Sequence, residues 1–465
     1  MNEEMKRICF LIPDGIGIRN YLYSDVISIL VKQGHQVILW HSLDPELIKL
    51  TEKRLDVNFE QYLFTHKPDG KRVQLLRESA RFARLKLNAR KKNNPTILTN
   101  WTGRSASRKG KLLIKGAEFI GGFLRSYDLI ASTESYEFKL VRKSKEFYSA
   151  KKFLEEIKPD LVFCTHQRVF SVTSAIEAAK SLGIPTSTAI FSWDNLPKGR
   201  LPFRTDQYLV WSEYMYDELR SYYPEILEHQ IEVTGSPQFD FYYKEGIILE
   251  SGELASKYGL DASKTWVCFS GCDTVTSPDD PKYLSDVAES LMDHDEVELI
   301  FRPVPVEKVD RFLPVLEKFN KIKLIKPIWV TGSHWGNFFP LYEDIQLLVN
   351  LAYHCKVVVN MGSTMALDFS TFGNIGLYLR YDHQGVKPES SVETIFRFQH
   401  FRSMGDLKAV GYIHSPSEIK PKIIEAIENA EEIAPDRKLW FDKIVEPKTS
   451  QTAATRIVQA ISKLL

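Results

Sequence analysis

The stretch ICFLIPDGIGIRN, residues 8–20, places a run of five apolar residues before a glycine-containing turn and an amphipathic segment. This order is typical of a strand, a tight turn and a helix in an α/β domain. The apolar run is continuous rather than alternating, as expected for a strand that helices cover on both faces. Because short apolar runs alternate with helical patterns in both halves of the chain, the sequence predicts two parallel α/β sheets.

The apolar runs predict strands in each half of the chain. In the first half they cover residues 8–12, 36–40, 160–165, 186–191, 207–211 and 231–234, and in the second half 266–270, 298–302, 323–325, 356–360 and 375–381. The turn-rich stretch 235–246 separates the halves. We therefore expect Rossmann-like domains over residues 1–240 and 247–445, followed by a helical segment within 446–465. Two such domains facing a cleft would bind a ligand at the carboxyl ends of their strands.

Composition indicates a soluble globular enzyme. The 465 residues are 43% hydrophobic and 26% charged, and the net charge of +1 favours no particular partner. The five cysteines are odd in number and lack the partners of a zinc site, so we expect reduced thiols, a cytoplasmic protein and no metal centre. No apolar run approaches the length of a spanning helix or a signal sequence.

The segment 71–115 is the one strongly biased region, with fourteen Lys or Arg residues and a single acid, Glu78. It belongs to a basic insertion, expected to be helical, over about residues 71–150. A solvated helix face is one interpretation of such a segment. Since Leu75, Phe82 and Trp101 lie among the cations, contact with an anionic membrane surface is another. Nucleic acid is disfavoured, because the chain has no nucleic-acid-binding motif and its overall charge is near neutral.

The stretch VVVNMGSTMALDFSTFG, residues 357–373, is the sharpest candidate for chemistry. A strand ends before Gly362, and Ser363 and Thr364 begin a helix whose free N–H groups can bind phosphate. Asp368 lies one turn further along the same face, where its carboxylate could accept hydrogen bonds from ribose hydroxyls. The competing interpretation is that Ser363 only caps the helix.

Two further strand ends in the second half could contact a ligand. Arg302 ends the run IFRPVP, residues 300–305, and its guanidinium could bind a diphosphate with two hydrogen bonds or form a surface ion pair. Ser270 and Gly271 follow the first strand of this half, where small residues leave room for a ligand.

In the first half, FSWDNLPKGR, residues 191–200, follows a strand. Its carboxylate, Asp194, is the leading candidate for a general base, because an apolar strand end can move a carboxyl pKa toward a useful value. The alternative is an ordinary turn. His166, at the end of the strand 160–165, is the second candidate base. Neighbouring residues expected to contact an acceptor are Trp193, Asn195 and Lys198.

The opening stretch itself matches only part of the dinucleotide fingerprint G-x-G-x-x-G. Gly15 and Gly17 are present, but Asn20 takes the third position, and the strand 36–40 is followed by His41 rather than by an acid. Nicotinamide and flavin cofactors are therefore disfavoured. Asp14, Gly15 and Gly17 instead form a turn at which an acceptor or a donor sugar could approach the backbone.

Four stretches in order resemble the landmarks of bacterial GT-B-type transferases, the glycosyltransferases and CDP-glycerol glycerophosphotransferases that build surface polysaccharides. They are FSWDNLPKGR (191–200), VTGSPQFDFY (233–242), IFRPVP (300–305) and VVVNMGSTMALDFSTFGNIGL (357–377). The resemblance covers about residues 160–381, whereas 45–152 match no family. It implies a C-terminal domain that binds a nucleotide-activated donor, an N-terminal domain that binds the acceptor, and a last helix that crosses back onto the N-terminal domain.

Carried over to this sequence, the resemblance implies that Arg302, Ser363 and Thr364 bind the donor phosphates, that Asp368 binds the ribose, and that the loop from Pro327 to Trp329 binds the base. Many relatives have histidine after the Arg-Pro pair, where this chain has Val304. That departure weakens the case for phosphotransferase chemistry and favours sugar transfer.

We therefore expect a metal-independent glycosyltransferase that moves a sugar from a nucleotide-sugar donor to a surface-polysaccharide or lipid-linked glycan acceptor. The nucleotide sugar would be a substrate, so no cofactor is expected. The protein would be cytoplasmic, and the segment 71–115 allows a peripheral position on the inner face of the cytoplasmic membrane. The alternatives are a CDP-glycerol or CDP-ribitol phosphotransferase, a sugar-nucleotide epimerase, and a non-catalytic scaffold for glycan assembly.

Overall fold

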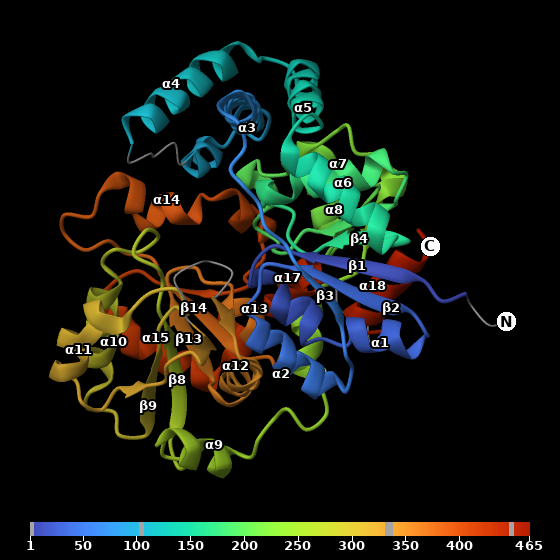
Figure 1. Ribbon diagram of the computed structural model, residues 1–465. Coiled ribbons are helices and arrows are strands. Elements are labelled where there is room, and N and C mark those ends of the chain that lie inside the picture. Colours follow the sequence, from blue (N-terminus) through green and yellow to red (C-terminus); the bar gives the residue numbers. More distant parts are fainter. Residues whose placement is uncertain (1–3, 102–106, 331–337, 446–450) are drawn as a thin grey trace. The chain divides into compact units, whose positions relative to one another are not determined.

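The computed structural model describes residues 4–101, 107–330, 338–445 and 451–465. The chain folds as two compact units (Figure 1). Among the described residues, unit 1 comprises 4–238 and 451–465, and unit 2 comprises 239–330 and 338–445. The first crossing between units falls inside the turn-rich stretch 235–246, where a short 3-10 helix spans Pro237–Tyr243.

Unit 1 is built on a sheet of seven parallel strands in the order β3-β2-β1-β4-β5-β6-β7. The strands are β1 (Arg7–Ile12), β2 (Gln36–His41), β3 (Glu60–Leu63), β4 (Leu161–Cys164), β5 (Thr186–Ala189), β6 (Gln207–Val210) and β7 (Ile231–Val233). The helices are α1 (Val26–Lys32), α2 (Pro45–Leu55), α3 (Lys71–Lys91), α4 (Arg108–Phe123), α5 (Tyr127–Val141), α6 (Lys145–Ile157), α7 (Thr173–Ser181), α8 (Glu213–Tyr222) and α18 (Ala453–Ser462).

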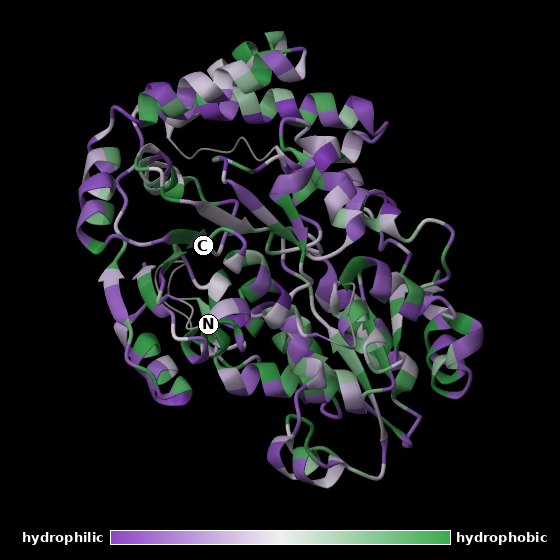
Figure 2. Ribbon diagram, turned by 90° about the vertical axis from the view of Figure 1, so that its right-hand side faces the viewer, coloured by the Kyte–Doolittle hydropathy of each residue, from purple (hydrophilic) through white to green (hydrophobic). Residues whose placement is uncertain are grey.

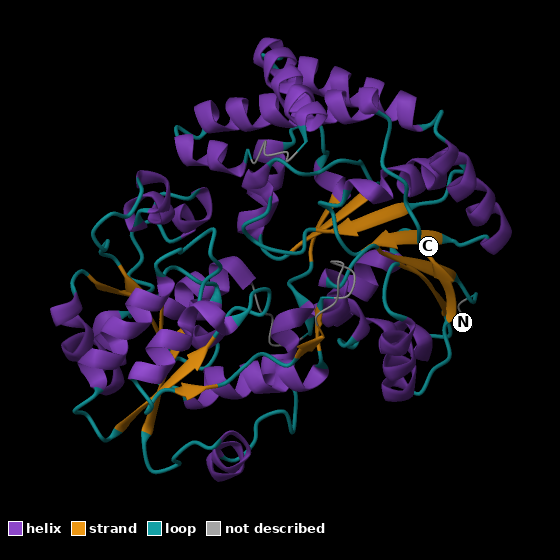
Figure 3. Ribbon diagram, turned by 60° about the vertical axis from the view of Figure 1, so that its left-hand side comes forward, coloured by secondary structure: helices purple, strands orange, loops and turns teal. Residues whose placement is uncertain are grey.

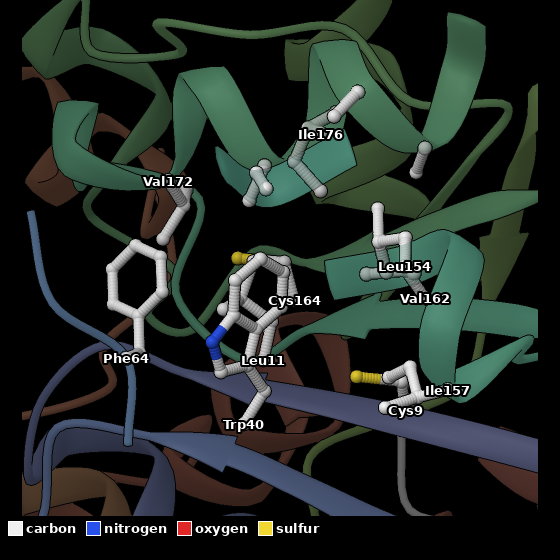
Figure 4. Packing of buried hydrophobic residues seen from close by; sticks show 14 of the residues in the cluster. Cys9, Leu11, Trp40, Phe64, Leu154, Ile157, Val162, Cys164, Val172 and Ile176 are labelled. Atoms are coloured by element: carbon white, nitrogen blue, oxygen red, sulfur yellow. The ribbon is translucent and has the colours of Figure 1, made fainter. Parts of the chain in front are cut away.

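The core of unit 1 follows from the alternation of side chains along its buried strands. Cys9 and Leu11 of β1 point to one face, together with Trp40 of β2 and residues of β4. Helices α6 and α7 cover that face with Leu154 and other apolar side chains (Figure 4). On the other face, Phe163 packs edge-on against Tyr21 with ring centroids 5.0 Å apart. Strands buried on both faces explain why the apolar runs in the sequence are continuous.

Unit 2 contains a second parallel sheet, with six strands in the order β10-β9-β8-β13-β14-β15. Its strands are β8 (Thr265–Ser270), β9 (Val297–Arg302), β10 (Lys323–Leu324), β13 (Val357–Asn360), β14 (Ile375–Leu379) and β15 (Gly411–Ile413), and a small antiparallel pair joins β11 (Trp329–Val330) to β12 (Phe339–Pro340). The helices are α9 (Ser251–Tyr258), α10 (Asp280–Leu291), α11 (Leu313–Lys318), α12 (Tyr342–His354), α13 (Met365–Ser370), α14 (Val392–Phe396), α15 (Ile419–Glu428), α16 (Ala430–Ile433) and α17 (Arg437–Val445).

These two parallel sheets confirm the predicted fold class. Helices lie around the strands of each sheet (Figure 3). The strands that were not expected are the edge strands β3 and β15 and the small separate pair β11 and β12. The helix expected from Ser363 begins at Met365. No helix in the described part of the chain is both long and apolar enough to cross a membrane.

The basic insertion forms helices α3 to α6 of unit 1, and α3 packs against both α4 and α5 (Figure 1). Two of its cations are buried in ion pairs: Arg77 Nε lies 2.6 Å from Glu137, and Arg84 Nη2 lies 2.8 Å from Glu134. Hydrophobic and hydrophilic residues are intermixed along these helices, at the top of Figure 2. Among the described residues of segment 71–115, the cations thus divide into buried ones on α3 and exposed ones, which lie on both α3 and α4.

Helix α18 belongs to unit 1, although it follows all of unit 2 in the sequence. It packs against α1, and the Gln207 side chain of β6 donates a hydrogen bond to the carbonyl of Ala460 (2.8 Å). Gly235 has a φ of +76°, and a Cβ there would lie 2.4 Å from the guanidinium of Arg456 on α18. Glycine at this position therefore lets the end of the unit 1 sheet and α18 approach closely.

Candidate active site

Two side chains that follow neighbouring strands of unit 1 meet at the carboxyl edge of its sheet. Strands β1 and β4 pair in parallel, so the residues after them leave the sheet at the same edge. Asp14 Oδ2 lies 2.7 Å from His166 Nδ1. Asp14 was expected near an acceptor and His166 as a candidate base, and the structure brings them together as a hydrogen-bonded pair.

The surroundings of this pair favour a defined histidine orientation. The side chains of His166 and Asp14 are 7% and 14% exposed, and the Phe191 ring contacts the imidazole edge-on with centroids 4.6 Å apart. Asp14 Oδ1 accepts a hydrogen bond from the backbone N–H of Ile16 (3.1 Å). Within the described residues, the buried Nε2 of His166 has no hydrogen-bond partner. A carboxylate on Nδ1 fixes the proton there and leaves Nε2 with a lone pair for a substrate proton.

Gly17 explains how the turn after β1 reaches β4. A Cβ at Gly17 would lie 2.5 Å from Thr165 Oγ1, so any side chain would push the turn away from the residue before His166. Gly15 is buried in the same turn. Strand β1 has β2 on one side and β4 on the other. The pair therefore lies at the point where the strand order reverses, which is where open α/β sheets bind ligands.

The other candidate base, Asp194, is held by its own loop. Its Oδ1 accepts hydrogen bonds from Ser192 Oγ (2.6 Å) and Asn195 Nδ2 (3.2 Å), and Lys198 Nζ lies 2.5 Å from Oδ2. Trp193 and Asn195 are buried, and Asn195 Oδ1 accepts from Arg168 Nη1 (2.8 Å). These contacts are those of an ordered turn, and the catalytic role of Asp194 stays a prediction.

In unit 2, three expected residues lie together at the carboxyl edge of the sheet. Ser270 of β8 is opposite Arg302 of β9 in the parallel register, and the Gly271 N–H donates to the Arg302 carbonyl (2.9 Å). Strand β8 lies between β9 and β13, so this is the reversal point of the second sheet. A Cβ on Gly271 would lie 3.2 Å from the Phe301 ring and 3.4 Å from Pro303, which accounts for glycine there.

A buried carboxyl that the sequence analysis missed, Asp280, lies beside this loop. Its Oδ2 accepts a hydrogen bond from the Cys272 N–H (2.8 Å). Burial raises the pKa of Asp280 to about 7, against the opposing effect of that N–H and of Arg311. Its position at the start of α10 resembles ordinary capping, and no sequence pattern distinguishes it from a helix cap.

Arg302 is paired with a second residue that the sequence analysis missed. Its Nη2 lies 3.0 Å from both carboxylate oxygens of Asp344, and the two side chains are each 5% exposed. Asp344 also accepts hydrogen bonds from the Ile328 N–H (2.8 Å) and the Trp329 indole (2.8 Å). One carboxylate thus fixes both Arg302 and the loop from Pro327 to Trp329. Arg302 Nη1 is buried and has no partner in the described part of the chain.

The turn after β13 is organised by Asn360. Its Oδ1 accepts hydrogen bonds from the N–H groups of Gly362 (2.8 Å) and Ser363 (2.7 Å), two of the donors expected to bind phosphate. Gly362 has a φ of +91°, and a Cβ there would lie 2.7 Å from the Phe401 ring. Thr364 is exposed at the same edge. The phosphate-binding role of this turn stays a prediction that requires Asn360 to share or release these donors.

Asp368 lies inside unit 2 rather than at its surface. The side chain is buried, and its Oδ1 accepts a hydrogen bond from the hydroxyl of Tyr242 (2.6 Å). This bond joins α13 to the stretch 235–246. The ribose-binding role of Asp368 also stays a prediction. Among the described residues, no group of three or more acidic, histidine or cysteine side chains is arranged to hold a metal ion.

Comparisons with known proteins bear on the fold. No family model matches the chain, and no curated protein matches it by sequence. Solved structures do match over nearly the whole chain. A UDP-GlcNAc 2-epimerase from Neisseria meningitidis bound to UDP-GlcNAc is 12% identical, with 98% of this chain and 100% of that one covered and a TM-score of 0.52. The S. aureus protein MnaA in a structure with UDP is 12% identical over 99% and 98% of the chains, with a TM-score of 0.51.

A glycosyltransferase from Rickettsia africae matches in the same way, with 12% identity, 99% and 98% coverage, and a TM-score of 0.50. At this level of identity the likeness concerns the fold alone. The fold of this chain is therefore the GT-B type, with two Rossmann-like parallel-sheet domains.

Proposed function

We propose that this protein is an enzyme that acts on a nucleotide sugar and transfers the sugar to a hydroxyl group of an acceptor. The observation that carries the proposal is the Asp14–His166 pair at the reversal point of the unit 1 sheet, where Nε2 has no hydrogen-bond partner among the described residues. A buried imidazole that a carboxylate orients is a general base of the kind that acyl- and group-transfer enzymes use.

In this mechanism Nε2 of His166 takes the proton of the acceptor hydroxyl as its oxygen bonds to the anomeric carbon. The bond from that carbon to the diphosphate oxygen breaks, and the nucleoside diphosphate leaves with the electron pair. Asp14 stabilises the imidazolium that forms, which is the role of a buried carboxylate on Nδ1. The proton balance is complete without a further reactant, and the chemistry calls for no cofactor.

Unit 2 offers groups that suit a departing diphosphate. Arg302 is opposite Ser270 in the strand register, and its buried Nη1 has no partner in the described residues. The turn from Gly362 to Thr364 lies at the end of β13. A guanidinium and backbone N–H groups stabilise developing negative charge when they are already positioned. In this proposal the diphosphate of the donor binds at this edge of the unit 2 sheet. The nucleobase of the donor binds at the loop of Pro327 and Trp329.

Epimerisation of a nucleotide sugar is the second candidate, and it is supported by the two UDP-related structures among the neighbours. One observation favours transfer. Unit 1 contains a pocket of about 810 Å³ along the same sheet edge as His166, formed with α3 and α4. A second substrate requires such a pocket, whereas an epimerase has a single substrate to bind.

Product analysis separates the two candidates. The protein is incubated in D₂O with UDP-, GDP- and CDP-sugars, without an acceptor. Epimerisation breaks a C–H bond, so it would place deuterium in the recovered sugar. Transfer predicts no deuterium, slow release of one nucleoside diphosphate by hydrolysis, and faster release when the acceptor is added. Deuterium incorporation that disappears in a His166→Ala variant would overturn the transferase proposal in favour of epimerisation.

The proposed acceptor suggests a position at the membrane surface. The outward face of α4 exposes Leu112, Phe119 and Phe123 at 73%, 69% and 62%, and the exposed cations Arg108, Lys109, Lys111 and Lys115 lie on the same helix. Exposed apolar side chains beside cations suit the interface of an anionic bilayer. We include peripheral membrane contact through α4 in the proposal. The membrane contact expected for the segment 71–115 is thereby assigned to this one helix.

A further inference from the structure

The pocket in unit 1 lies between the insertion and the carboxyl edge of the sheet. Its wall consists of the beginnings of α3 and α4 and of residues that follow β2, β3, β4 and β5. Phe64, Phe170, Leu113 and Ile114 supply apolar surface. All these residues belong to unit 1, and Phe170 is four residues beyond His166 in the sequence.

The polar lining of this pocket is unusually basic. Lys71, Arg77, Arg81 and Arg200 line it, and Glu78 is the one acid that does so in the described residues. A smaller cavity of about 60 Å³ adjoins it, and Arg77, Arg81 and Arg200 line that cavity too, together with Arg168 and three glutamates. The four arginines are therefore gathered in one place.

The acids do not balance this cluster evenly. Arg77 is neutralised by Asp69 and Glu137, each 2.6 Å away. Arg81 has Glu78 at 3.3 Å. Arg200, by contrast, makes no hydrogen bond or ion pair with any residue in the described ranges. An arginine without a counter-charge at a pocket wall is a group that an anionic ligand can pair with.

Several buried guanidinium donors around the pocket have no partner within the described ranges, namely Arg77 Nη2, Arg81 Nε and Arg168 Nε. The two ring nitrogens of His66 have none there either, and one of them is a donor in the neutral imidazole. The side chains of Arg77 and Arg81 are 9% and 10% exposed. Buried donors are seldom left unsatisfied, so this concentration of them at one pocket points to a ligand rich in acceptor oxygens.

Electrostatics agree with this geometry. Burial and the nearby charge of Arg200 lower the pKa of Arg81 to about 10. The same two causes, in the same order, lower the pKa of Arg168. The arginines therefore repel one another, and a bound anion would relieve the repulsion.

We propose that this pocket binds a phosphate or diphosphate ester, with the phosphate oxygens on Arg81 and Arg200 and the organic part against Phe64, Phe170 and the apolar residues of α4. This ester is the acceptor substrate of the proposed transfer reaction, an identification that rests on the proposed function. The acceptor is then a phosphorylated molecule. An aromatic and aliphatic wall beside a guanidinium cluster suits a ligand that is anionic at one end and sugar- or lipid-like at the other.

The test is isothermal titration of the full chain with inorganic pyrophosphate in the presence of saturating UDP, which blocks the proposed nucleotide site of unit 2. Arg200→Ala should weaken pyrophosphate binding by about tenfold or more, because the substitution removes a charged hydrogen-bond donor. Its thermal unfolding should match the wild type, since Arg200 loses no hydrogen bond or ion pair to the described residues. Arg72→Ala, an exposed cation on α3 outside the pocket, is the matched control and should bind as the wild type does. Equal pyrophosphate affinity in Arg200→Ala and the wild type would overturn the proposal.

A second titration identifies the source of the phosphate. Farnesyl diphosphate in detergent micelles should bind through Arg200 and more tightly than pyrophosphate if the ester is lipid-linked, whereas equal affinities indicate a soluble phosphate ester. Farnesol, which has no phosphate, should not bind. The proposal would also be overturned if farnesol bound as tightly as farnesyl diphosphate and Arg200→Ala did not weaken that binding. If the wild type binds no UDP and turns over no nucleotide sugar, the proposed function fails, while Arg200-dependent pyrophosphate binding would still establish the pocket.

Discussion

At the scale of single residues, the base assignment is the step that experiment can decide first. His166 has a carboxylate on Nδ1 and a buried Nε2 that no described residue contacts by a hydrogen bond, whereas both oxygens of Asp194 accept hydrogen bonds within their own loop. His166→Ala should therefore lower the turnover number by about a hundredfold to ten-thousandfold, the usual contribution of a general base. Release of nucleoside diphosphate in the presence of acceptor is the measurement.

Two companion variants make this prediction specific. Asp14→Asn keeps the shape of the pair and removes its charge, so kcat should fall while KM for the donor stays close to that of the wild type. Asp194→Asn should retain most of the turnover and chiefly loosen the turn around Lys198. Full activity in His166→Ala together with its loss in Asp194→Asn would return the assignment to Asp194.

The sequence named Asp14 and His166 separately but could not pair them. They are separated by 152 residues, and only the adjacency of β1 and β4 brings them together. Asp344 was missed for a related reason. It is one of two acids in the first turn of α12, where a carboxylate is common, and only the fold shows that it holds Arg302 and Trp329.

At the scale of elements, α4 is the helix whose exposed face has a testable role. Replacing Leu112 and Phe119 by serine should lower binding to vesicles that contain about 30% anionic lipid by roughly tenfold or more, because the buried apolar area supplies much of the binding energy. Cosedimentation with vesicles is the measurement.

Leu439→Ser is the matched control, since that leucine is 58% exposed on α17 of unit 2. It should bind vesicles as the wild type does. Thermal unfolding of the α4 variant should also be unchanged, because the altered side chains face solvent. Equal binding of wild type and α4 variant would remove the membrane contact from the proposal.

Elements were predictable where burial leaves a pattern in the sequence. β1 and β13 are buried along nearly their whole length and appear as continuous apolar runs. β3, with the sequence EQYL, is an exposed edge strand, so nothing in its composition marks it. The helical nature of the insertion was predicted, but its pocket was not, because the lining comes from several segments that only the fold brings together.

At the scale of the whole molecule, buried carboxyls make stability depend on pH. Glu218 of α8 is buried, and Tyr214 donates a hydrogen bond to its Oε1 (3.3 Å). Burial raises its pKa to about 8, against the opposing effect of Lys92. The unfolded chain releases this proton near the ordinary glutamate pKa, whereas the folded chain holds it to about pH 8. Glu218 therefore contributes a fall in the free energy of unfolding as pH rises through that interval.

Glu218→Gln should remove part of this fall. Between pH 5 and pH 8 we expect the free energy of unfolding of the variant to fall by on the order of 1–3 kcal/mol less than that of the wild type. Urea unfolding curves at the two pH values are the measurement. Glu253→Gln, an exposed glutamate on α9, should leave the pH dependence as it is. An unchanged pH dependence of the free energy of unfolding in Glu218→Gln would contradict the prediction.

The membership of α18 in unit 1 has a consequence for the synthesis of the protein. A ribosome releases all seven strands of the first sheet, then the whole of unit 2, and only then the helix that packs against α1 and β6. At about 5–20 residues per second, the roughly 200 residues in between take about ten to forty seconds to translate. During that time the surface awaiting α18 is open to chaperones and to neighbouring nascent chains. Of the two units, the one that is translated first is thus completed last.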